Sequence, residues 1–288
     1  MSYLITGASG YVGEYLKKQM VVQGEKFYAA TRGDFEYTDI DTIRAFFEGK
    51  DITHVFHLAG AINISDSTAI FDTNIAGLYN LLTICKENRV KHFCFASGNN
   101  VYGIYKDSSY NEEDYIYTDN SNYYGLSKYV GELLIKDFCL SNGMDFACVR
   151  ISDIYGPRQK HGNLIKSIVK NVLNRNSISL YGDGLRERDY IYITDVVEGL
   201  LFISKNSISG IVNLGTGKGT KVKEIVSIAN ELSNYECGIT KIIVDKEDTT
   251  KVILDCTKLK SLGFEANVDI KTGLMNIISE ELSNGKRN

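Results

Sequence analysis

The sequence lacks most of the features that mark secreted, metal-binding or nucleic-acid-binding proteins. It has no tryptophan, one proline (Pro157) and six cysteines, and no two cysteines form a Cys-x-x-Cys pair. A disulfide framework is therefore not indicated, and we expect reduced cysteines in the core, as is usual in the cytoplasm. The four histidines lack the spacing of metal ligands, so no metal site is expected. The net charge of −4, without a long run of lysine or arginine, also argues against a nucleic-acid partner.

Long apolar runs are absent as well. No stretch reaches the roughly 18 apolar residues that a membrane-spanning helix needs. The opening MSYLITG enters a strand pattern at once, which leaves no room for a signal peptide. With 43% hydrophobic and 24% charged residues over 288 positions, the chain can bury a sizeable core. We therefore expect a cytoplasmic globular protein with no membrane segment.

What the sequence does have is a regular alternation of strand and helix patterns. Short apolar runs predict strands, and the stretches between them carry apolar residues at helical spacing. The predicted strands are YLIT (3–6), KFYAATR (26–32), THVFHLAG (53–60), KHFCFASG (91–98) and DFACVRIS (145–152). The predicted helices between them are 13–24, 39–50, 71–90 and 121–143. This alternation predicts an α/β fold, a doubly wound parallel sheet of the Rossmann type.

Beyond about residue 153 the alternation becomes less regular. Helix patterns at 162–175 and 221–233 flank a strand and turn at 178–184. We expect a dinucleotide-binding Rossmann domain at 1–153, to which segments near 189–216 return. A smaller C-terminal α/β substrate-binding domain is expected at 154–288.

A glycine-rich loop follows the first predicted strand. GASGYVG places Gly7, Gly10 and Gly13 between a strand and a helix, and Tyr11 and Val12 open that helix. Residues without a Cβ let the backbone approach a pyrophosphate, and the N-terminus of a helix favours its negative charge. In this strand–loop–helix setting the motif predicts dinucleotide binding.

A tyrosine and a lysine stand four residues apart in the helix predicted at 121–143. Tyr124 and Lys128 share one face of that helix. An ammonium beside a phenol favours the phenolate and lowers a pKa that starts at about 10. Tyr124 is thus a candidate acid–base group for moving a hydroxyl proton while a hydride moves to or from a nicotinamide.

These motifs together resemble the extended short-chain dehydrogenase/reductases, and within them the NAD(P)-dependent nucleotide-sugar epimerase/dehydratase family. The similarity runs nearly from end to end, in order, through TGASGYVG, VFHLAG, NIAGLYNLL, VYG, YGLSK, RISDIYGP, GNLI, RDYIYITDVVEG and VNLGTG. The resemblance implies a Rossmann domain that holds a nicotinamide cofactor. It also implies a C-terminal domain that holds a nucleoside-diphosphate sugar.

The resemblance implies roles for individual residues on the cofactor side. Tyr124 would be the catalytic base, and Lys128 would support it and bind the nicotinamide ribose. The cofactor would be lined by Leu58, Ala59 and Gly60.

On the substrate side the resemblance implies fewer contacts. Asn163 and Arg188 would meet the diphosphate of the substrate, and Tyr181 would lie near its base. Asp153 stands where the family often has an asparagine that contacts the substrate phosphate. Because a carboxylate repels a diphosphate, Asp153 either turns away or the bound group is less anionic. Dimers of the family form through its two long helices, so a homodimer is a further expectation.

The segment before VYG departs from the family pattern. Relatives usually carry a serine or threonine three residues ahead of the valine, where this chain has Gly98. Ser97 stands one place earlier, and alternation along the strand should turn it away from the site unless the strand end twists. Losing a hydrogen bond to a developing oxyanion can cost roughly a hundredfold in rate. Either Asn99 or Asn100 replaces the donor, which we prefer, or Ser97 is rotated in, or activity is weak, or a bulkier substrate group fills the space over Gly98.

The residue at position 100 also bears on the reaction. Dehydratases and decarboxylases of the family carry a carboxylate, usually glutamate, where this chain has Asn100, a candidate substrate contact. An amide cannot shuttle the proton that eliminating water requires. The preferred function is therefore a nucleotide-sugar epimerase that acts at C4 through a transient keto-sugar. The main alternative is an NADPH-dependent keto-sugar reductase, followed by a dehydratase or a catalytically weak cofactor-binding protein.

The residues after the second predicted strand bear on the choice of cofactor. NAD-specific relatives place an acidic residue there for the ribose hydroxyls, whereas this chain has Thr31 and Arg32. A guanidinium suits a 2′-phosphate and can stack on adenine, which favours NADP. Glu36 and Tyr37 would then flank the adenine. Because epimerases of the family generally retain NAD, the expected cofactor is NAD or NADP.

Overall fold

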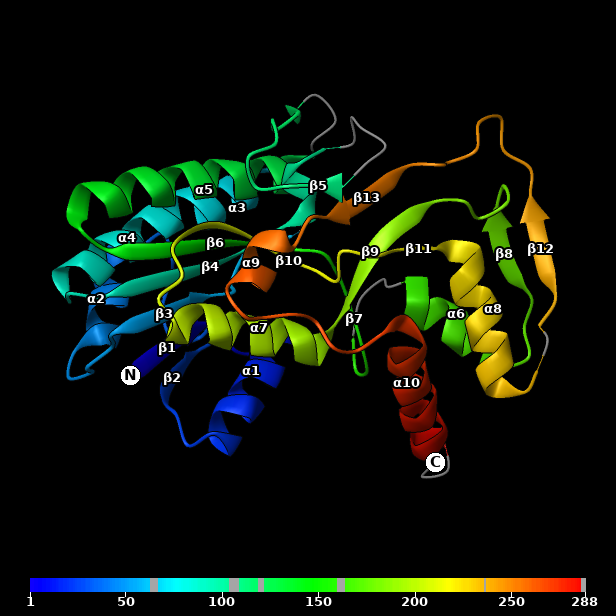
Figure 1. Ribbon diagram of the computed structural model, residues 1–288. Helices are drawn as coiled ribbons and strands as arrows, with labels where there is room; N and C mark the ends of the chain where they lie inside the picture. The colour runs from blue at the N-terminus through cyan, green and yellow to red at the C-terminus, as the bar shows by residue number, and fades with distance from the viewer. Residues whose placement is uncertain (63–66, 104–108, 119–121, 160–163, 236, 286–288) are drawn as a thin grey trace. The chain divides into compact units, whose positions relative to one another are not determined.

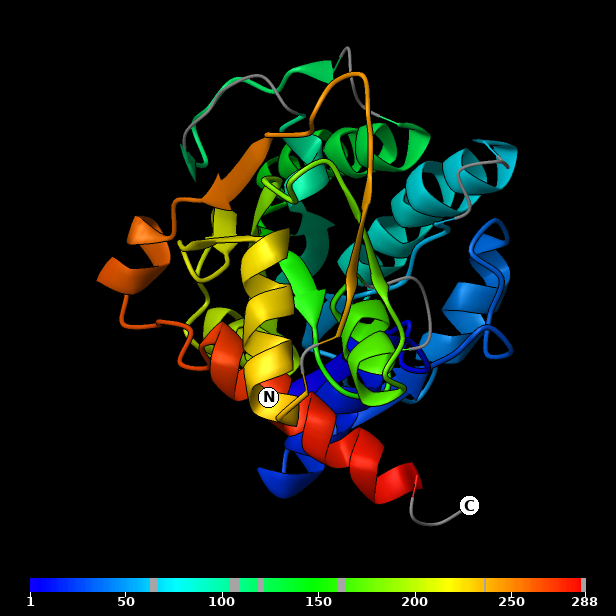
Figure 2. The ribbon, with the colours of Figure 1, turned by 90° about the vertical axis from the view of Figure 1, so that its right-hand side faces the viewer.

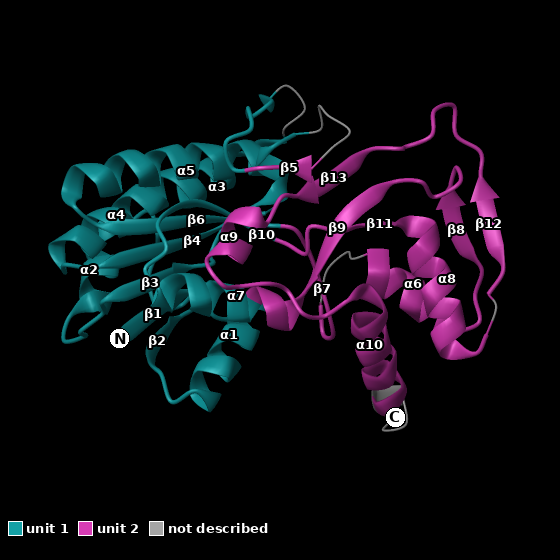
Figure 3. Ribbon diagram, in the orientation of Figure 1, with its two compact units in different colours: residues 1–103, 112–151, 197–214 teal, residues 104–111, 152–196, 215–288 magenta. Residues whose placement is uncertain are grey.

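The structure is a computed structural model, and it describes residues 1–62, 67–103, 109–118, 122–159, 164–235 and 237–285 (Figure 1). The chain divides into two compact units (Figure 3). Unit 1 consists of residues 1–103, 112–151 and 197–214. Unit 2 consists of residues 104–111, 152–196 and 215–288. Among the described residues, unit 1 forms one sheet and unit 2 forms two.

Unit 1 contains a six-stranded sheet in which every pairing is parallel. Its strands are β1 (Ser2–Thr6), β2 (Lys26–Ala30), β3 (His54–His57), β4 (His92–Gly98), β6 (Asp145–Ile151) and β10 (Gly210–Leu214). Across the sheet their order is β10-β6-β4-β3-β1-β2. The predicted doubly wound α/β fold is therefore confirmed. The winding reverses between β1 and β3, and ligands of such sheets bind outside the carboxyl ends of the strands at that point.

Helices cover both faces of this sheet (Figures 1 and 2). They are α1 (Tyr11–Val22), α2 (Ile40–Phe47), α3 (Ser67–Phe71), α4 (Gly77–Glu87), α5 (Tyr123–Asn142) and residues 197–205 of α7 (Ile193–Lys205). A 3-10 turn, η2 (Asn99–Val101), follows β4. Helices α2, α4 and α5 lie on one face, and α1 and the unit 1 part of α7 lie on the other (Figure 1).

The larger core of unit 1 lies between the sheet and helices α2, α4 and α5. Alternate strand residues such as Leu4, Val55 and Phe93 are fully buried there, against Leu81 and Ile135 of the helices. Burial of this kind is the main favourable term in folding. All six cysteines are buried and free of disulfides.

The helix predicted at 71–90 is not continuous. It is divided into α3, a π-helix η1 (Asp72–Ala76) and α4. One turn of π-helix inserted into an α-helix is uncommon and often found at functional sites. Here it carries the buried Asn74, and the apolar spacing of the sequence gave no sign of it.

Unit 2 is built on shorter strands. They are β5 (Ser109–Tyr110), β7 (Asp153–Tyr155), β8 (Ile178–Tyr181), β9 (Glu187–Tyr192), β11 (Gly219–Lys221), β12 (Ile239–Ile242) and β13 (Lys251–Leu254). One sheet has the order β11-β9-β13-β5 with β7 paired to β9, and β12 pairs with β8 in a second. The helices are α6 (Leu164–Leu173), α8 (Val222–Ser233), α9 (Thr257–Ser261) and α10 (Ile270–Gly285). Helices α6, α8 and α10 pack on one another.

The domain boundaries expected from the sequence were 1–153 and 154–288, with a return to the first domain near 189–216. The structure differs from this expectation in two segments. β9 is part of unit 2 because it pairs with β7, β11 and β13, and only 197–214 belongs to unit 1, where β10 extends the parallel sheet beside β6. The segment 104–111 belongs to unit 2, where β5 pairs with β13.

The motif RDYIYITD supplies a buried carboxylate that holds unit 2 together. Asp189 is fully buried and accepts hydrogen bonds from Thr216 Oγ1 at 2.6 Å, Thr216 N at 3.0 Å and Gly217 N at 3.1 Å. Burial raises the pKa of Asp189, and these hydrogen bonds oppose that shift. The VNLGTG motif thus meets Asp189 through its last residues.

Within the part of the chain that is described, none of the helices has the length and apolar character to cross a lipid bilayer.

Candidate active site

A groove of about 670 Å³ lies at the point of unit 1 where the winding reverses. It brings together nine residues that the sequence assigned to a cofactor. They are Gly7, Gly10, Thr31, Arg32, Glu36, Tyr37, Leu58, Ala59 and Gly60. The groove therefore joins the glycine loop after β1 with the ends of β2 and β3.

The glycines of the loop are required by close backbone contacts. Gly7 has a φ of +67°, and a Cβ there would lie 2.7 Å from the backbone nitrogen of Ala59. A Cβ on Gly13 would collide with the carbonyl oxygen of Gly7, so Gly13 lets α1 pack against the loop. Gly10 is the N-cap of α1. This cradle fits a pyrophosphate, because the loop backbone and the start of α1 are open to it.

Tyr11 and Val12 do not line the groove in the same way. They are the first two residues of α1 and are half-buried. The ring of Tyr11 packs edge-on against Tyr15, with 5.5 Å between centroids.

A tight turn follows β2 and holds the Thr31–Arg32 pair. The backbone nitrogen and the hydroxyl of Thr31 each donate to Asp34 Oδ2 at 2.7 Å. These bonds lower the pKa of Asp34 and commit the carboxylate to the turn. Arg32 and Glu36 are exposed and are the charged side chains that line the groove.

Lys128 lies beside this groove in a buried position. Its side chain is 3% exposed, and Nζ donates to the carbonyl oxygen of Ala96 at 2.9 Å. Nζ also lies 3.4 Å from the position that a Cβ of Gly60 would take, and 4.5 Å from the ring centroid of Phe95. Burial lowers the pKa of Lys128 to about 8, and the Glu132 carboxylate opposes this shift.

Tyr124 lies on the same face of α5, one turn earlier. The Lys128 ammonium is 5.7 Å from the centre of its ring. Burial raises the pKa of Tyr124 above its usual value, whereas the sequence predicted a lowered one. The reason is that Lys128 Nζ lies over the ring and bonds to Ala96, so its charge does not offset the desolvation of the phenol.

Asn74 connects the groove to α5 and was missed by the sequence reasoning. Its amide oxygen accepts from Ala61 N at 2.8 Å, and its amide nitrogen donates to Ala61 O and to Ser127 Oγ, both at 3.0 Å. The Ser127 hydroxyl donates to the carbonyl oxygen of Tyr124 at 2.8 Å. The π-helix thus holds the loop after β3 against the turn of α5 that carries Tyr124. An asparagine inside an apolar helix pattern was the available signal.

Ser97 points into a buried ion pair. Its hydroxyl donates to Glu132 Oε1 at 2.5 Å, and Arg150 Nη2 donates to Glu132 Oε2 at 2.7 Å. The side chains of Arg150 and Glu132 are 4% and 2% exposed. The hydroxyl of Ser97 is therefore committed to this ion pair and is not available to the reacting oxygen.

The two asparagines that follow Gly98 form the turn η2. Asn99 is half-buried, and its carbonyl oxygen accepts from Tyr102 N at 3.2 Å. Asn100 places its side-chain oxygen 2.8 Å from the position of a Cβ on Gly98. Its backbone oxygen lies 3.0 Å from the position of a Cβ on Gly125, the residue after Tyr124.

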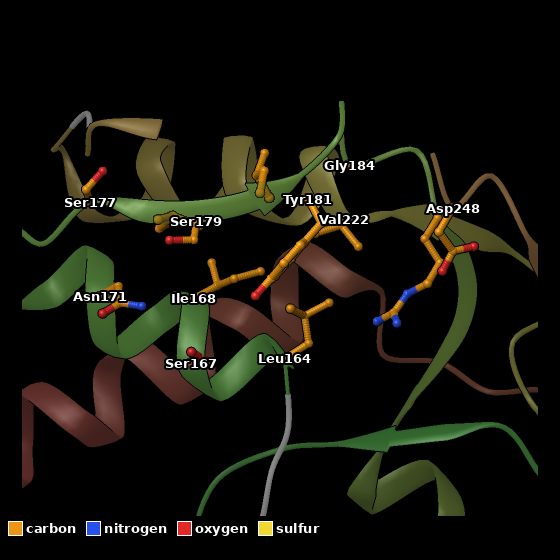
Figure 4. Close-up of a pocket in the computed structure, with 13 residues that line it drawn as sticks. Leu164, Ser167, Ile168, Asn171, Ser177, Ser179, Tyr181, Gly184, Val222 and Asp248 are labelled. Atoms are coloured by element: carbon orange, nitrogen blue, oxygen red, sulfur yellow. The ribbon is translucent and has the colours of Figure 1, made fainter. Parts of the chain in front are cut away.

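Unit 2 contains a separate pocket of about 530 Å³. It lies between α6 and β8, with Leu164 and Ile168 on the helix side and Ser179 and Tyr181 on the strand side (Figure 4). The mixture of apolar and hydroxyl-bearing side chains is typical of ligand pockets, which commonly measure about 300–1,000 Å³. Tyr181, which was expected near a substrate base, thus lines a cavity of suitable size.

Arg186, and not Arg188, lines this pocket. Arg188 Nη1 donates to the carbonyl oxygen of Thr250 at 2.8 Å and Nη2 to its hydroxyl at 2.9 Å. Arg186 Nε is buried and has no hydrogen-bond partner among the described residues. Burial, and then repulsion from Arg186, lower the pKa of Arg188. The sequence predicted Arg188 as the anion contact, whereas the structure places Arg186, two residues earlier, in the lining of the pocket.

Two further residues predicted to bind substrate remain. Asp153 is the first residue of β7 and pairs with Tyr190 of β9. Its carboxylate favours the charged form of Arg188. Asn163 lies outside the described residues. Among the residues that the structure describes, no group of three or more His, Cys, Asp or Glu side chains could hold a metal ion.

The parallel sheet, its glycine cradle and its groove define a Rossmann-type α/β enzyme of the extended short-chain dehydrogenase/reductase class. The chain belongs to the NAD dependent epimerase/dehydratase family, whose model matches residues 3–215.

Comparison with individual proteins agrees with this assignment. A Methanocaldococcus jannaschii protein with a provisional assignment as a UDP-glucose 4-epimerase is 29% identical, over 98% of this chain and 99% of its own. A dTDP-glucose 4,6-dehydratase of Streptomyces griseus is 28% identical over 94% of this chain and 91% of its own. The structure of a Thermotoga maritima UDP-glucose 4-epimerase with UDP-glucose superimposes with a TM-score of 0.87 at 26% identity, covering 99% of each chain.

Proposed function

We propose that the protein is a nucleotide-sugar epimerase that acts at C4 of the sugar through a transient 4-keto intermediate. The observation that carries the proposal is the position of Lys128. Its buried ammonium lies 3.4 Å from the position that a Cβ of Gly60 would take in the groove and 5.7 Å from the centre of the Tyr124 ring. A proton-transfer group is thereby held next to a dinucleotide-shaped cradle.

The groove of unit 1 is the proposed site of the nicotinamide cofactor. The glycines at 7, 10 and 13 would take the pyrophosphate, Leu58, Ala59 and Gly60 would line the dinucleotide, and Lys128 would meet the nicotinamide ribose. When bound, a nicotinamide dinucleotide supplies a hydride acceptor and, in its reduced form, a hydride donor.

Tyr124 is the proposed acid–base group. Its phenol oxygen takes the proton from the sugar hydroxyl as that carbon is oxidised, and returns it when the ketone is reduced. Because burial raises the pKa of Tyr124, the phenol is protonated in the protein alone, and the sugar hydroxyl and cofactor would have to supply the charge that favours the phenolate. Asn74 fixes both groups relative to the groove through Ala61 and Ser127.

The pocket of unit 2 is the proposed site of the nucleoside diphosphate. Arg186 is the proposed phosphate contact, because it lines the pocket and its buried Nε lacks a partner among the described residues. The relatives named above carry UDP-glucose and dTDP-glucose in their names, so these two nucleotides are the first to test.

Asn100 argues against dehydration, since an amide does not exchange the proton that loss of water requires. A keto-sugar reductase is the second candidate, and Arg32 favours it. A guanidinium at the edge of the groove suits a 2′-phosphate, and net reduction draws on NADPH. NADP preference is therefore part of the proposal.

A homodimer is also proposed. Tyr79 on α4 and Leu133 and Leu140 on α5 are 51%, 51% and 68% exposed, although large apolar side chains are usually covered. Light scattering after size exclusion should give twice the mass of the chain. A monomer at all concentrations would contradict this part.

The function is tested by extracting cofactor from the purified protein and then following a panel of UDP- and dTDP-sugars by proton NMR. Tightly held NAD(P)⁺ and interconversion of C4 epimers without added NADPH are expected. Conversion that needs stoichiometric NADPH would instead identify the reductase. Tyr124→Phe serves as the control, because it should abolish turnover and leave cofactor content unchanged.

A further inference from the structure

The end of β4 has an open position that a neighbouring side chain fills. Gly98 has φ −151° and ψ 165°, an extended conformation open to any residue, so the backbone does not require glycine. A Cβ at Gly98 would lie 2.8 Å from Asn100 Oδ1 and 3.7 Å from its Cγ. The carboxamide of Asn100 thus occupies the space that a side chain at position 98 would need.

Ser97 does not compete for this role. Its hydroxyl is 2.5 Å from Glu132 Oε1, and Arg150 fixes that carboxylate from the other side. Rotating Ser97 into the site would strip a buried carboxylate of a hydrogen bond, which costs stability.

Asn100 also packs against the turn of α5 that carries Tyr124. Its backbone oxygen packs 3.0 Å from the Cβ position of Gly125, so it contacts the first turn of α5, where Tyr124 stands. Its Oδ1 is buried and accepts no hydrogen bond among the described residues. A buried acceptor left unpaired is uncommon in folded proteins and calls for a partner.

An amide side chain can hydrogen-bond the reacting oxygen of the sugar both as an alcohol and as a ketone. Its oxygen accepts a hydrogen bond from an alcohol, and after a half-turn of the terminal group its nitrogen donates one to a ketone. A serine hydroxyl achieves the same by rotating its proton.

We propose that Asn100 is a catalytic residue that hydrogen-bonds the reacting oxygen of the sugar, in place of the side chain that position 98 lacks. The inference rests on the proposed epimerase function. Asn100 forms a hydrogen bond only, and the proton itself moves between the sugar oxygen and Tyr124.

The test moves the hydrogen-bonding side chain from position 100 to position 98. Asn100→Ala should lower kcat about a hundredfold, as the loss of one oxyanion donor does, with a smaller change in KM. Gly98→Ser alone should also lower kcat, because the new side chain crowds the carboxamide. The kcat of the double variant Gly98→Ser/Asn100→Ala should exceed that of Asn100→Ala about tenfold or more. Without the carboxamide, the serine has space at position 98 and can hydrogen-bond the reacting oxygen.

Two controls separate catalysis from folding. Asn100→Asp keeps the shape of the side chain but has no donor, so it should lose as much kcat as Asn100→Ala. Thermal melting should change little in Asn100→Ala, whereas Asn100→Asp should melt lower because it buries a charge. The affinity for UDP should change little in either variant.

The outcomes distinguish this inference from the proposed function. If turnover depends on Tyr124 but survives Asn100→Ala, the inference about Asn100 is overturned and the proposed function stands. The same holds if kcat falls in Asn99→Ala but not in Asn100→Ala. A wild-type protein without any Tyr124-dependent turnover overturns both.

Discussion

The hydroxyl of Ser97 donates to the carboxylate of Glu132 at 2.5 Å, inside a pair that Arg150 completes. The serine nearest to the expected catalytic position is therefore part of the buried support of β4 and α5. It lies on the opposite side of the strand from the space over Gly98.

Replacing Ser97 should consequently affect stability more than catalysis. Ser97→Ala removes a buried hydrogen bond to a charged group, which is worth about 1.5–3 kcal/mol. We expect the free energy of unfolding in urea to fall by about that amount and kcat to stay within about threefold. A loss of kcat of a hundredfold without loss of stability would return Ser97 to the catalytic site.

Lys128 should reduce the stability of the protein at neutral pH. Its folded pKa of about 8 lies below the unfolded value of 10.5, so the folded state disfavours the charged form. The cost is present in full below pH 8 and disappears as pH rises through 10.5. Lys128→Met should therefore raise the free energy of unfolding at pH 7 by about 3 kcal/mol while abolishing turnover.

Denaturant titrations of wild type and Lys128→Met from pH 7 to 10.5 check this expectation. The advantage of the variant should shrink steadily above pH 8. An advantage that is constant over this range would mean that burial does not shift the lysine.

Replacing Arg186 should affect substrate binding, whereas replacing Arg188 should affect stability. Arg186→Gln should weaken the binding of UDP about 10- to 100-fold in calorimetric titrations, because a charge-assisted contact to phosphate is lost. Arg188→Gln should mainly lower the melting temperature, since Arg188 holds the backbone at Thr250. The opposite result would restore Arg188 as the phosphate contact.

Arg32 should govern the choice between the two nicotinamide dinucleotides. Arg32→Ala should weaken NADP at least about tenfold more than NAD, because NAD lacks the 2′-phosphate that the guanidinium would meet. The measurement is the dissociation constant of NAD and of NADP for the wild type and for Arg32→Ala. Equal losses would mean that Arg32 stacks on adenine or serves the surface alone.

Local pattern was sufficient for the parallel sheet and for the residues of the groove. Apolar runs and helical spacing report burial directly, and the glycine loop adjoins β1 in sequence, so Gly7 could be placed from its strand alone. Ala59 was assigned to the cofactor through the family resemblance. Long-range pairings could not be obtained in this way. The two residues of β5 carry no period, and their place beside β13 depends on a partner more than 140 positions away.

The direction in which a side chain points was the second feature that the sequence could not predict. The sequence analysis chose Arg188 as the anion contact, but which of the two neighbouring arginines faces the pocket depends on the bonds of Arg188 to Thr250. In the same way, the carboxamide of Asn100 fills the space over Gly98 because η2 turns the chain back at that point. The lowered pKa expected for Tyr124 was wrong because it assumed an ammonium beside the hydroxyl, and the ammonium lies over the ring.

The division of the chain has a consequence for engineering. The backbone passes from one unit to the other after residues 103, 111, 151, 196 and 214. A single cut at any of these five crossings leaves both fragments with missing sheet neighbours, so neither half can be expressed as a self-contained module. Grafting a foreign specificity onto this scaffold must therefore proceed by replacing side chains in place, because whole-domain shuffling would sever β10 or β5 from its sheet.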